Sequence, residues 1–149
     1  MNLTRRAALV AAAALLALPA AAVAADLKVG VNVALSGPNS SLGIPYSKGM
    51  QAALAYKGEI AGRKIQLIVL DDASDPAAAA RNARKLVEED KVVAMVGGTT
   101  TGATLAMMPL FEEAQIPLIS LAGAIQIIEP VRKWVFKTPH TDKMACEKI

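Results

Sequence analysis

The stretch "RKIQLIVLDDASDPAAAARNARKLVEEDKVVAMVGG" at residues 63–98 indicates a strand, a helix and a second strand in succession. The run 63–72 is nearly continuously apolar, which is typical of a strand buried on both faces. Asp75 and Pro76 predict the start of a helix over 75–90, because aspartate caps helix N-termini and proline fits the first helical position. The apolar run 92–97 predicts the next strand. Two strands joined by a helix favour parallel pairing.

The same alternation of strand and helix patterns extends in both directions from this unit. Further strands are expected at 27–35, 116–122 and 133–139, and further helices at 46–58, at 102–115 and from 141 onward. Continuous apolar strands separated by helices predict an α/β fold with a parallel, doubly wound sheet that is covered on both faces.

The first 25 residues have the pattern of a secretory signal peptide. Arg5 and Arg6 precede an apolar run that Pro19 ends, and small residues follow it. The precursor has a formal net charge of +3, which falls to +1 when a leader carrying Arg5 and Arg6 is removed. No basic stripe remains, so no nucleic-acid partner is expected. The single cysteine, Cys146, excludes an internal disulfide framework. We therefore expect a secreted protein, and the family resemblance described below implies that it is periplasmic.

Three loops rich in glycine and hydroxyl residues follow the expected strands, at 36–45, 97–102 and 120–123. Ligands bind at the carboxyl ends of the strands in an open parallel sheet. Thr101 is placed to cap the helix that follows the second loop, where free backbone N–H groups suit a carboxylate or a phosphate. The alternative is that Thr101 only caps this helix.

The sequence lacks the motifs of the common catalytic and cofactor-binding sites. "GGTTTG" at 97–102 lacks the Gly-Lys-Ser/Thr ending of a phosphate-binding loop, and neither a dinucleotide fingerprint nor a nucleophile elbow is present. One histidine, His140, and one cysteine make a zinc site unlikely. Asp71, Asp72 and Asp75 do not follow the spacing of a calcium loop and are better explained as strand-end acids followed by a helix cap. We expect no enzyme activity, no metal and no cofactor.

The residues also resemble a known family. The segments "VGVNVALSGPNSSLG", "GMQAAL", the stretch 60–98, "IPLIS" and "RKWVFKT" occur in an order and at a spacing similar to those of the periplasmic leucine/isoleucine/valine-binding proteins. These type I periplasmic binding proteins are the substrate-binding components of branched-chain amino acid ABC transporters. The resemblance implies an inner-membrane ABC permease as partner, and two α/β lobes that trap the ligand between them.

The resemblance also implies which residues bind the ligand. Thr101 would contact the ligand's carboxylate beside Thr99 and Thr100, and the backbone at Ala122 would take its amino group. Gly123 and Ala124 follow in the same loop, where the position of Ala124 usually carries a hydroxyl in the branched-chain binders. The loop position of Leu42 often carries an aromatic residue in the family. Related members take other amino acids, amides or aromatic carboxylates, so the predicted ligand is an amino acid or a small carboxylate.

Members of the family are more than twice as long as this sequence. The resemblance implies a signal peptide at 1–25, an incomplete N-terminal lobe at 26–138, and at 139–149 the hinge and the start of a truncated second lobe. A ligand-sensing receptor of the same fold and a truncated, non-functional remnant are the alternatives to a transport component. A lone partial lobe cannot close over its ligand, so weak affinity is expected.

Overall fold

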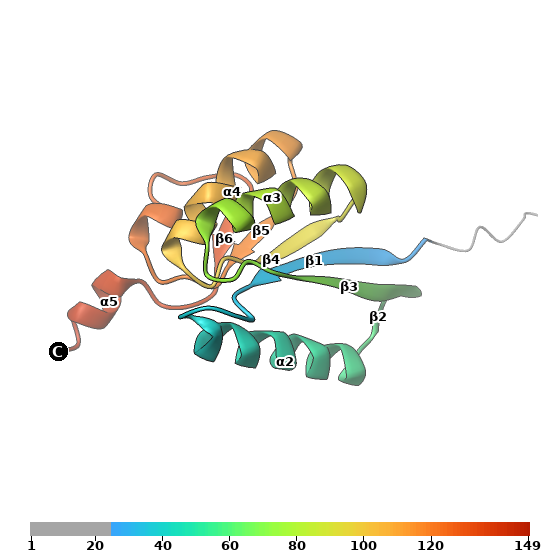
Figure 1. Cartoon of the computed structure of the whole chain (residues 1–149), viewed down its shortest axis with the longest axis horizontal. Helices are drawn as coiled ribbons and strands as arrows, with labels where there is room; N and C mark the ends of the chain where they lie inside the picture. The colour runs from blue at the N-terminus through green and yellow to red at the C-terminus, as the bar shows by residue number, and fades with distance from the viewer. Residues whose placement is uncertain (1–24) are drawn as a thin grey trace, which may run out of the picture.

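The computed structural model describes residues 25–149. The expected signal peptide lies outside these described residues, except for Ala25. Six strands form one sheet in the order β2-β3-β1-β4-β5-β6 (Figure 1). All neighbouring strands are parallel except the edge pair of β2 and β3, an antiparallel contact that the sequence patterns did not predict. The strands are β1 (Leu27–Val33), β2 (Glu59–Ile60), β3 (Arg63–Asp71), β4 (Ala94–Gly97), β5 (Leu118–Ser120) and β6 (Val135–Lys137).

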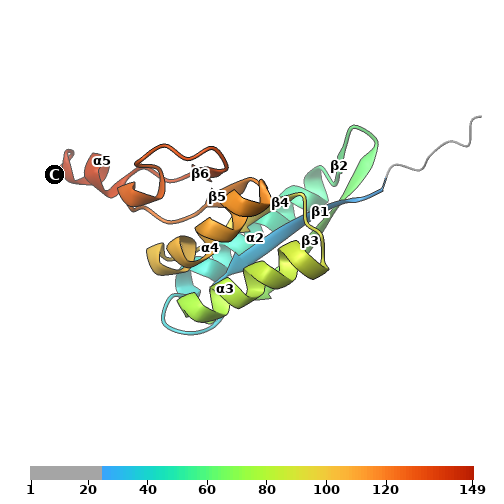
Figure 2. The ribbon, with the colours of Figure 1, turned by 90° about the horizontal axis from the view of Figure 1, so that it is seen from above.

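Helices lie on both faces of the sheet, so the predicted doubly wound arrangement is confirmed. The helix α2 (Ser40–Tyr56) covers one face, while α3 (Pro76–Arg84) and α4 (Thr101–Ala114) lie side by side over the other (Figures 1 and 2). Asp75 caps α3 as predicted, because its carboxylate accepts the N–H groups of Ala77 and Ala78. The remaining elements are a π-helical turn, η1 (Lys85–Glu89), a 3₁₀ turn, η2 (Ile125–Ile127), and the short helix α5 (Asp142–Cys146).

The hydrophobic core lies between the sheet and the pair α3 and α4. Its largest fully buried apolar side chains are Phe111, Leu86, Met95, Met107, Leu118 and Ile127. The polar side chain of Asn32, in β1, is also fully buried there. Its side-chain amide donates to the Ala79 carbonyl at 3.1 Å, and its side-chain oxygen accepts from Asn82 at 3.0 Å. These bonds satisfy most of a buried amide and fix α3 against β1.

The expected loop at 36–45 is correct only in its first half, because α2 begins at Ser40 and includes Pro45. Leu42 therefore lies in the first turn of a helix and not in a loop. Within this helix, a Cβ at Gly43 would overlap the Ala34 carbonyl, so only glycine lets the helix pack this closely on the end of β1. The turn-forming residues of this stretch are visible in the sequence and the contact at Gly43 is not, so the sequence pattern predicted a loop.

Cover on the α2 face decreases from the middle of the sheet toward β6. Paired residues form one row across this face: Val69, Val31, Val96, Ile119 and Phe136. Val31 is fully buried, Val96 and Ile119 are half-buried, and Phe136 is 51% exposed. An apolar groove of about 230 Å³ lies between α2 and the strands β3, β1 and β4, and Val29 and Val96 form part of its lining.

Candidate functional site

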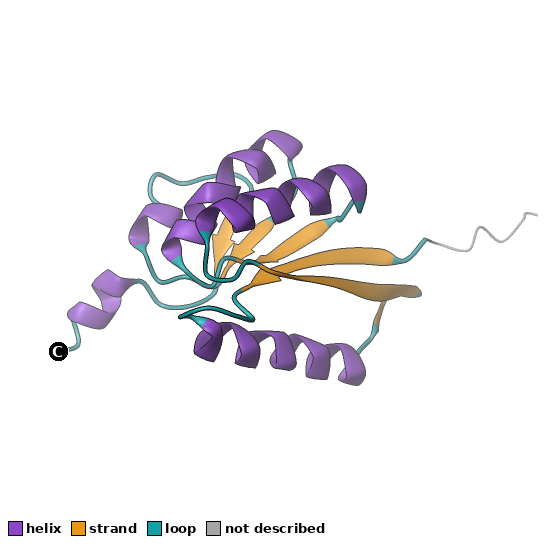
Figure 3. Cartoon of the chain, in the orientation of Figure 1, coloured by secondary structure: helices purple, strands orange, loops and turns teal. Residues whose placement is uncertain are grey.

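The loops that follow the carboxyl ends of the strands gather at one end of the molecule, where α2, α3 and α4 also begin (Figure 3). This is the edge at which ligands bind in open parallel sheets. The site is built from three segments: the turn 36–39 after β1, the loop 98–100 after β4, and the loop 121–124 after β5.

Asp71, the last residue of β3, holds the turn after β1. Its carboxylate accepts the N–H groups of Leu35 at 2.8 Å and Ser36 at 3.2 Å, and the Ser36 hydroxyl at 2.6 Å. Desolvation acts to raise the pKa of Asp71, but the hydrogen bonds from Ser36, Ala73 and Leu35 outweigh it and hold that pKa below its ordinary value. A charged carboxylate at Asp71 is therefore part of the native turn.

The neighbouring Asp72 has the opposite environment. It is 1% exposed, and although Oδ1 accepts the Ser74 N–H at 2.9 Å, Oδ2 has no hydrogen-bond partner among the described residues. Desolvation raises the pKa of Asp72, and the charges of Asp71 and Asp75 add to the rise. The pKa values of two adjacent aspartates are thus shifted in opposite directions.

The three threonines predicted as ligand contacts have three different roles in the structure. Thr99 is buried, and its hydroxyl accepts the Ala34 N–H at 3.1 Å, which ties the loop after β4 to the end of β1. Thr100 caps α4, since its hydroxyl accepts the Ala103 N–H at 3.2 Å. The prediction that Thr101 is the cap is therefore wrong by one residue. Thr101 is the first helical residue, and its half-buried hydroxyl makes no hydrogen bond to the described part of the chain.

A buried hydroxyl pair, which the sequence patterns did not identify, joins the second and third loops. Thr104 Oγ1 lies 2.9 Å from Ser120 Oγ and donates to the Gly98 carbonyl at 3.1 Å. Ser120 Oγ in turn accepts the Ala122 N–H at 3.2 Å. Gly98 has a φ of 73°, and a Cβ there would overlap the Thr104 side chain, so the position requires glycine. The pair fixes the spacing between the helix start and the loop 121–124.

This framework leaves several polar groups without protein partners at the edge. Among the hydrogen bonds of the described residues, none uses the N–H groups of Thr101 and Gly102 or the carbonyl of Ala122. Helix N-terminal N–H groups carry partial positive charge and suit a carboxylate, whereas a carbonyl suits an ammonium group. The edge can therefore hold a small molecule that carries an anionic group and, beside it, a donor group.

The other predicted contacts are distributed unevenly around this point. Ala122 and Ala124 are buried, Gly123 is half-buried between them, and all three lie in the loop that Ser120 fixes. Leu42 is 51% exposed and lies on α2, across the sheet from α4, at the same edge. The loops that carry Thr99–Thr101 and Ala122–Ala124 are joined by the bond from the Leu121 N–H to the Gly97 carbonyl and by the pair of Thr104 and Ser120, whereas no described hydrogen bond joins Leu42 to either loop.

Residues 25–149 contain neither a cluster of metal ligands nor a membrane-spanning helix. No group of three or more histidine, cysteine, aspartate or glutamate side chains lies close enough to hold a metal ion. No helix in this part of the chain combines the length and apolar character needed to cross a membrane.

A hollow of about 630 Å³ lies between α3 and α4, lined by later turns of both helices rather than by the strand-end loops.

Comparison with known proteins gives the family. The model of the periplasmic binding protein family matches residues 26–149. The chain belongs to the type I periplasmic binding proteins. The Leu/Ile/Val-binding protein of Escherichia coli K12 is 34% identical to it over 126 residues, which cover 83% of this chain and 34% of that protein.

Two solved structures of periplasmic binding proteins resemble the fold closely. The branched-chain amino acid transporter substrate-binding protein LivJ from Streptococcus pneumoniae, solved with isoleucine, gives a TM-score of 0.73 at 31% identity and covers 78% of this chain and 34% of that one. A solute-binding protein of an ABC transporter from Rhodopseudomonas palustris BisB5, solved with 3,4-dihydroxy benzoic acid, gives a TM-score of 0.73 at 32% identity, covering 78% and 32%. The chain thus spans about a third of the length of these two-lobe relatives.

Proposed function

We propose that this protein is a periplasmic solute-binding component of an ABC importer for amino acids, or for a related small carboxylate. The observation that carries the proposal is the set of unpartnered groups at one edge: the N–H groups of Thr101 and Gly102, the Thr101 hydroxyl, and the Ala122 carbonyl. In this proposal the first three receive the ligand's carboxylate and the carbonyl receives its amino group. The binding role needs no reaction, and the matched relatives are named as binding proteins.

Two features of the chain support the finer parts of this proposal. The bonded frame of Thr104 and Ser120 holds the helix start and the loop 121–124 at a fixed spacing, which is what recognition of a small zwitterion requires. The expected leader at 1–25 would direct the protein to the periplasm, where an inner-membrane ABC permease would be its partner. Residues 26–138 would then form part of one ligand-binding lobe, and 139–149 the hinge and the start of the second.

A nuclear magnetic resonance titration of the whole exported chain tests the site. Leucine and 3,4-dihydroxybenzoate are added separately to the ¹⁵N-labelled protein. We expect the amide signals of Thr101, Gly102 and Gly123 to move with the ligand, while those at the far ends of α3 and α4 stay in place. Shifts that are absent for both ligands, or that centre on the hollow between α3 and α4, would rule the proposed site out.

A further inference from the structure

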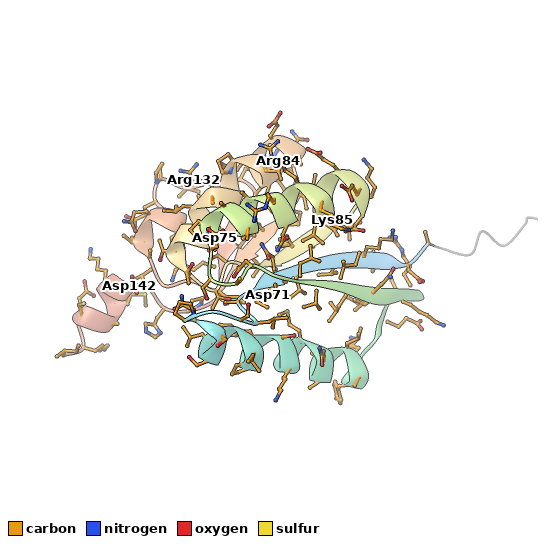
Figure 4. All side chains as sticks on the ribbon, in the orientation of Figure 1. Asp71, Asp75, Arg84, Lys85, Arg132 and Asp142 are labelled. Carbon is orange, nitrogen blue, oxygen red and sulfur yellow. The ribbon has the colours of Figure 1, made fainter. Side chains whose placement is uncertain are left out.

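The first residue of α5, Asp142, lies directly against the loop of the candidate site. Its backbone N–H donates to the Gly123 carbonyl at 3.1 Å, and its carboxylate sits on the α-carbon of Gly123, where a Cβ would overlap Oδ1. Gly123 is therefore a position where the absence of a side chain makes room for a carboxylate. Figure 4 shows Asp142 where α5 meets the body of the protein, at the same end as the strand-end loops.

The carboxylate of Asp142 is exposed and is not committed to another charge. The ion pairs of residues 25–149 join Lys85 to Glu89 and Asp90, and Arg132 to Glu112, so Asp142 takes part in none of them. The nearest cation along the chain before it, Lys137, donates to the carbonyls of Pro139 and His140 instead.

The unpartnered carbonyl of Ala122 belongs to the peptide unit that joins Ala122 to Gly123. A carboxylate resting on the Gly123 α-carbon therefore lies beside that carbonyl, separated by little more than one residue's span. An ammonium group has three donors and can bond to a carbonyl and a carboxylate together. The two acceptors differ in one respect, because only the carboxylate gains from the ligand's positive charge.

We propose that Asp142 is a specificity-determining residue that selects ligands carrying an ammonium group next to their carboxylate, over plain carboxylates. This inference rests on the proposed function of the same site. The N–H groups at the start of α4 would bind the carboxylate of either ligand class. Asp142 and the Ala122 carbonyl would bind only the ammonium group of an amino acid. The negative charge of Asp142 attracts an ammonium group, repels a second carboxylate, and has no charge to attract in an uncharged aromatic group.

A purely structural role for Asp142 is the competing explanation. An acidic residue in a first helical turn stabilises a helix, and α5 has only five residues. However, Thr141 already caps α5 by accepting the Met144 N–H at 3.1 Å. The backbone hydrogen bond from Asp142 to Gly123 accounts for the position of α5 but needs no charge on the side chain, and a structural role predicts equal effects on all ligands.

The experiment measures the affinity of the whole exported chain for leucine and for 4-methylpentanoate, which is leucine without its amino group. Three variants are compared with the parent: Asp142→Asn, which keeps the shape and removes the charge; Gly123→Ala, whose Cβ displaces the carboxylate; and Glu147→Gln, the control. Glu147 is an exposed carboxylate of the same terminal segment and does not contact Gly123. Thermal unfolding of each variant reports any change in the fold.

We expect the parent to bind leucine more tightly than 4-methylpentanoate. Asp142→Asn should weaken leucine binding about fivefold, the upper range for an exposed ion pair, and leave 4-methylpentanoate binding unchanged. Gly123→Ala should reduce the same preference, and Glu147→Gln should retain it. Equal affinities of the parent for the two ligands, or equal losses for both in Asp142→Asn, would overturn the role of Asp142 while the carboxylate site stands. Binding of neither ligand by the parent would overturn the proposed function and this inference together.

Discussion

Adjacent threonines at the start of α4 should separate stability from binding. The perturbation is a pair of isosteric substitutions, Thr100→Val and Thr101→Val, each of which replaces one hydroxyl by a methyl group. The Thr100 hydroxyl accepts the Ala103 N–H at 3.2 Å, whereas the Thr101 hydroxyl has no partner among the described residues. The first variant therefore loses a helix cap, and the second loses only a group that we propose contacts the ligand.

The magnitudes follow from these two environments. Loss of a threonine cap costs about 1 kcal/mol of unfolding free energy. For a domain of this size that lowers the melting temperature by about 3–6 °C. Thr101→Val should leave stability nearly unchanged, because valine and threonine have similar helix propensities. It should weaken ligand binding by about 1–3 kcal/mol, the cost of leaving a charged carboxylate one donor short.

Two measurements on each variant complete this test. Urea unfolding gives the stability, and a leucine titration followed by amide chemical shifts gives the affinity. The expected pattern is crossed: Thr100→Val less stable with affinity nearly retained, and Thr101→Val equally stable with affinity reduced. If both variants lost stability equally, the assignment of the cap would be wrong. If Thr101→Val bound leucine as the parent does, Thr101 would have no role in the site.

The remaining predictions concern the strand-end aspartates and the core. Asp71→Asn should lower stability at neutral pH, because the hydrogen bonds that offset its desolvation hold the pKa of Asp71 below 3.8, and the deficit should vanish in urea titrations as the pH falls through the pKa of the folded state. Asp72→Asn should raise stability at pH 7, because desolvation raises the pKa of Asp72 above 3.8; this gain should be absent at pH 3, where the parent's carboxyl is also neutral, and a gain that persists there would contradict the charge argument. Phe111→Ala, at a fully buried site, should cost about 3–5 kcal/mol in chemical denaturation, and a loss below about 1 kcal/mol would mean that the core between α4 and the sheet is not packed as described.

Local signals in the sequence were sufficient for the strand–helix–strand unit at 63–98. Asp75 and Pro76 set the start of α3 by local contacts, because the Asp75 carboxylate accepts the N–H groups of the residues two and three positions later. Buried parallel strands produce unbroken apolar runs. The parallel, doubly wound class of the sheet followed from the alternation of strand and helix patterns. These features depend on neighbours in the sequence, which is why they could be predicted without a structure.

The errors arose where a contact distant in sequence decides the outcome. Gly43 and Pro45 are typical of loops, yet both lie inside α2, where Gly43 packs against the Ala34 carbonyl. The buried pair of Thr104 and Ser120 was also missed, although Thr104 shares a helical stripe with Met108 and Phe111, and a hydroxyl in such a stripe signals a buried partner.

Within the candidate site, the sequence predicted the segments better than the roles of single residues. Thr100 and Thr101 both follow a glycine pair, and the exact start of a helix depends on backbone angles that no local pattern specifies. The contact between Asp142 and Gly123 joins two elements that are nineteen residues apart in the chain. Such a pairing becomes visible only when β5 and β6 lie side by side in the sheet.

Because the cover of the sheet decreases along the row from Val31 to Phe136, the two loops of the site rest on strands that are buried to different degrees. The loop 98–100 follows β4, which lies next to the long central strand β1. The loop 121–124 and α5 follow β5 and β6, two three-residue strands at the thinly covered end of the sheet. Local opening of a protein starts where buried apolar contacts are fewest. A ligand that bridges the two loops would bind only while this edge of the sheet is closed, and it would therefore stabilise the closed form. Amide exchange in β5 and β6 would then slow by a factor that rises with the ratio of free ligand concentration to Kd.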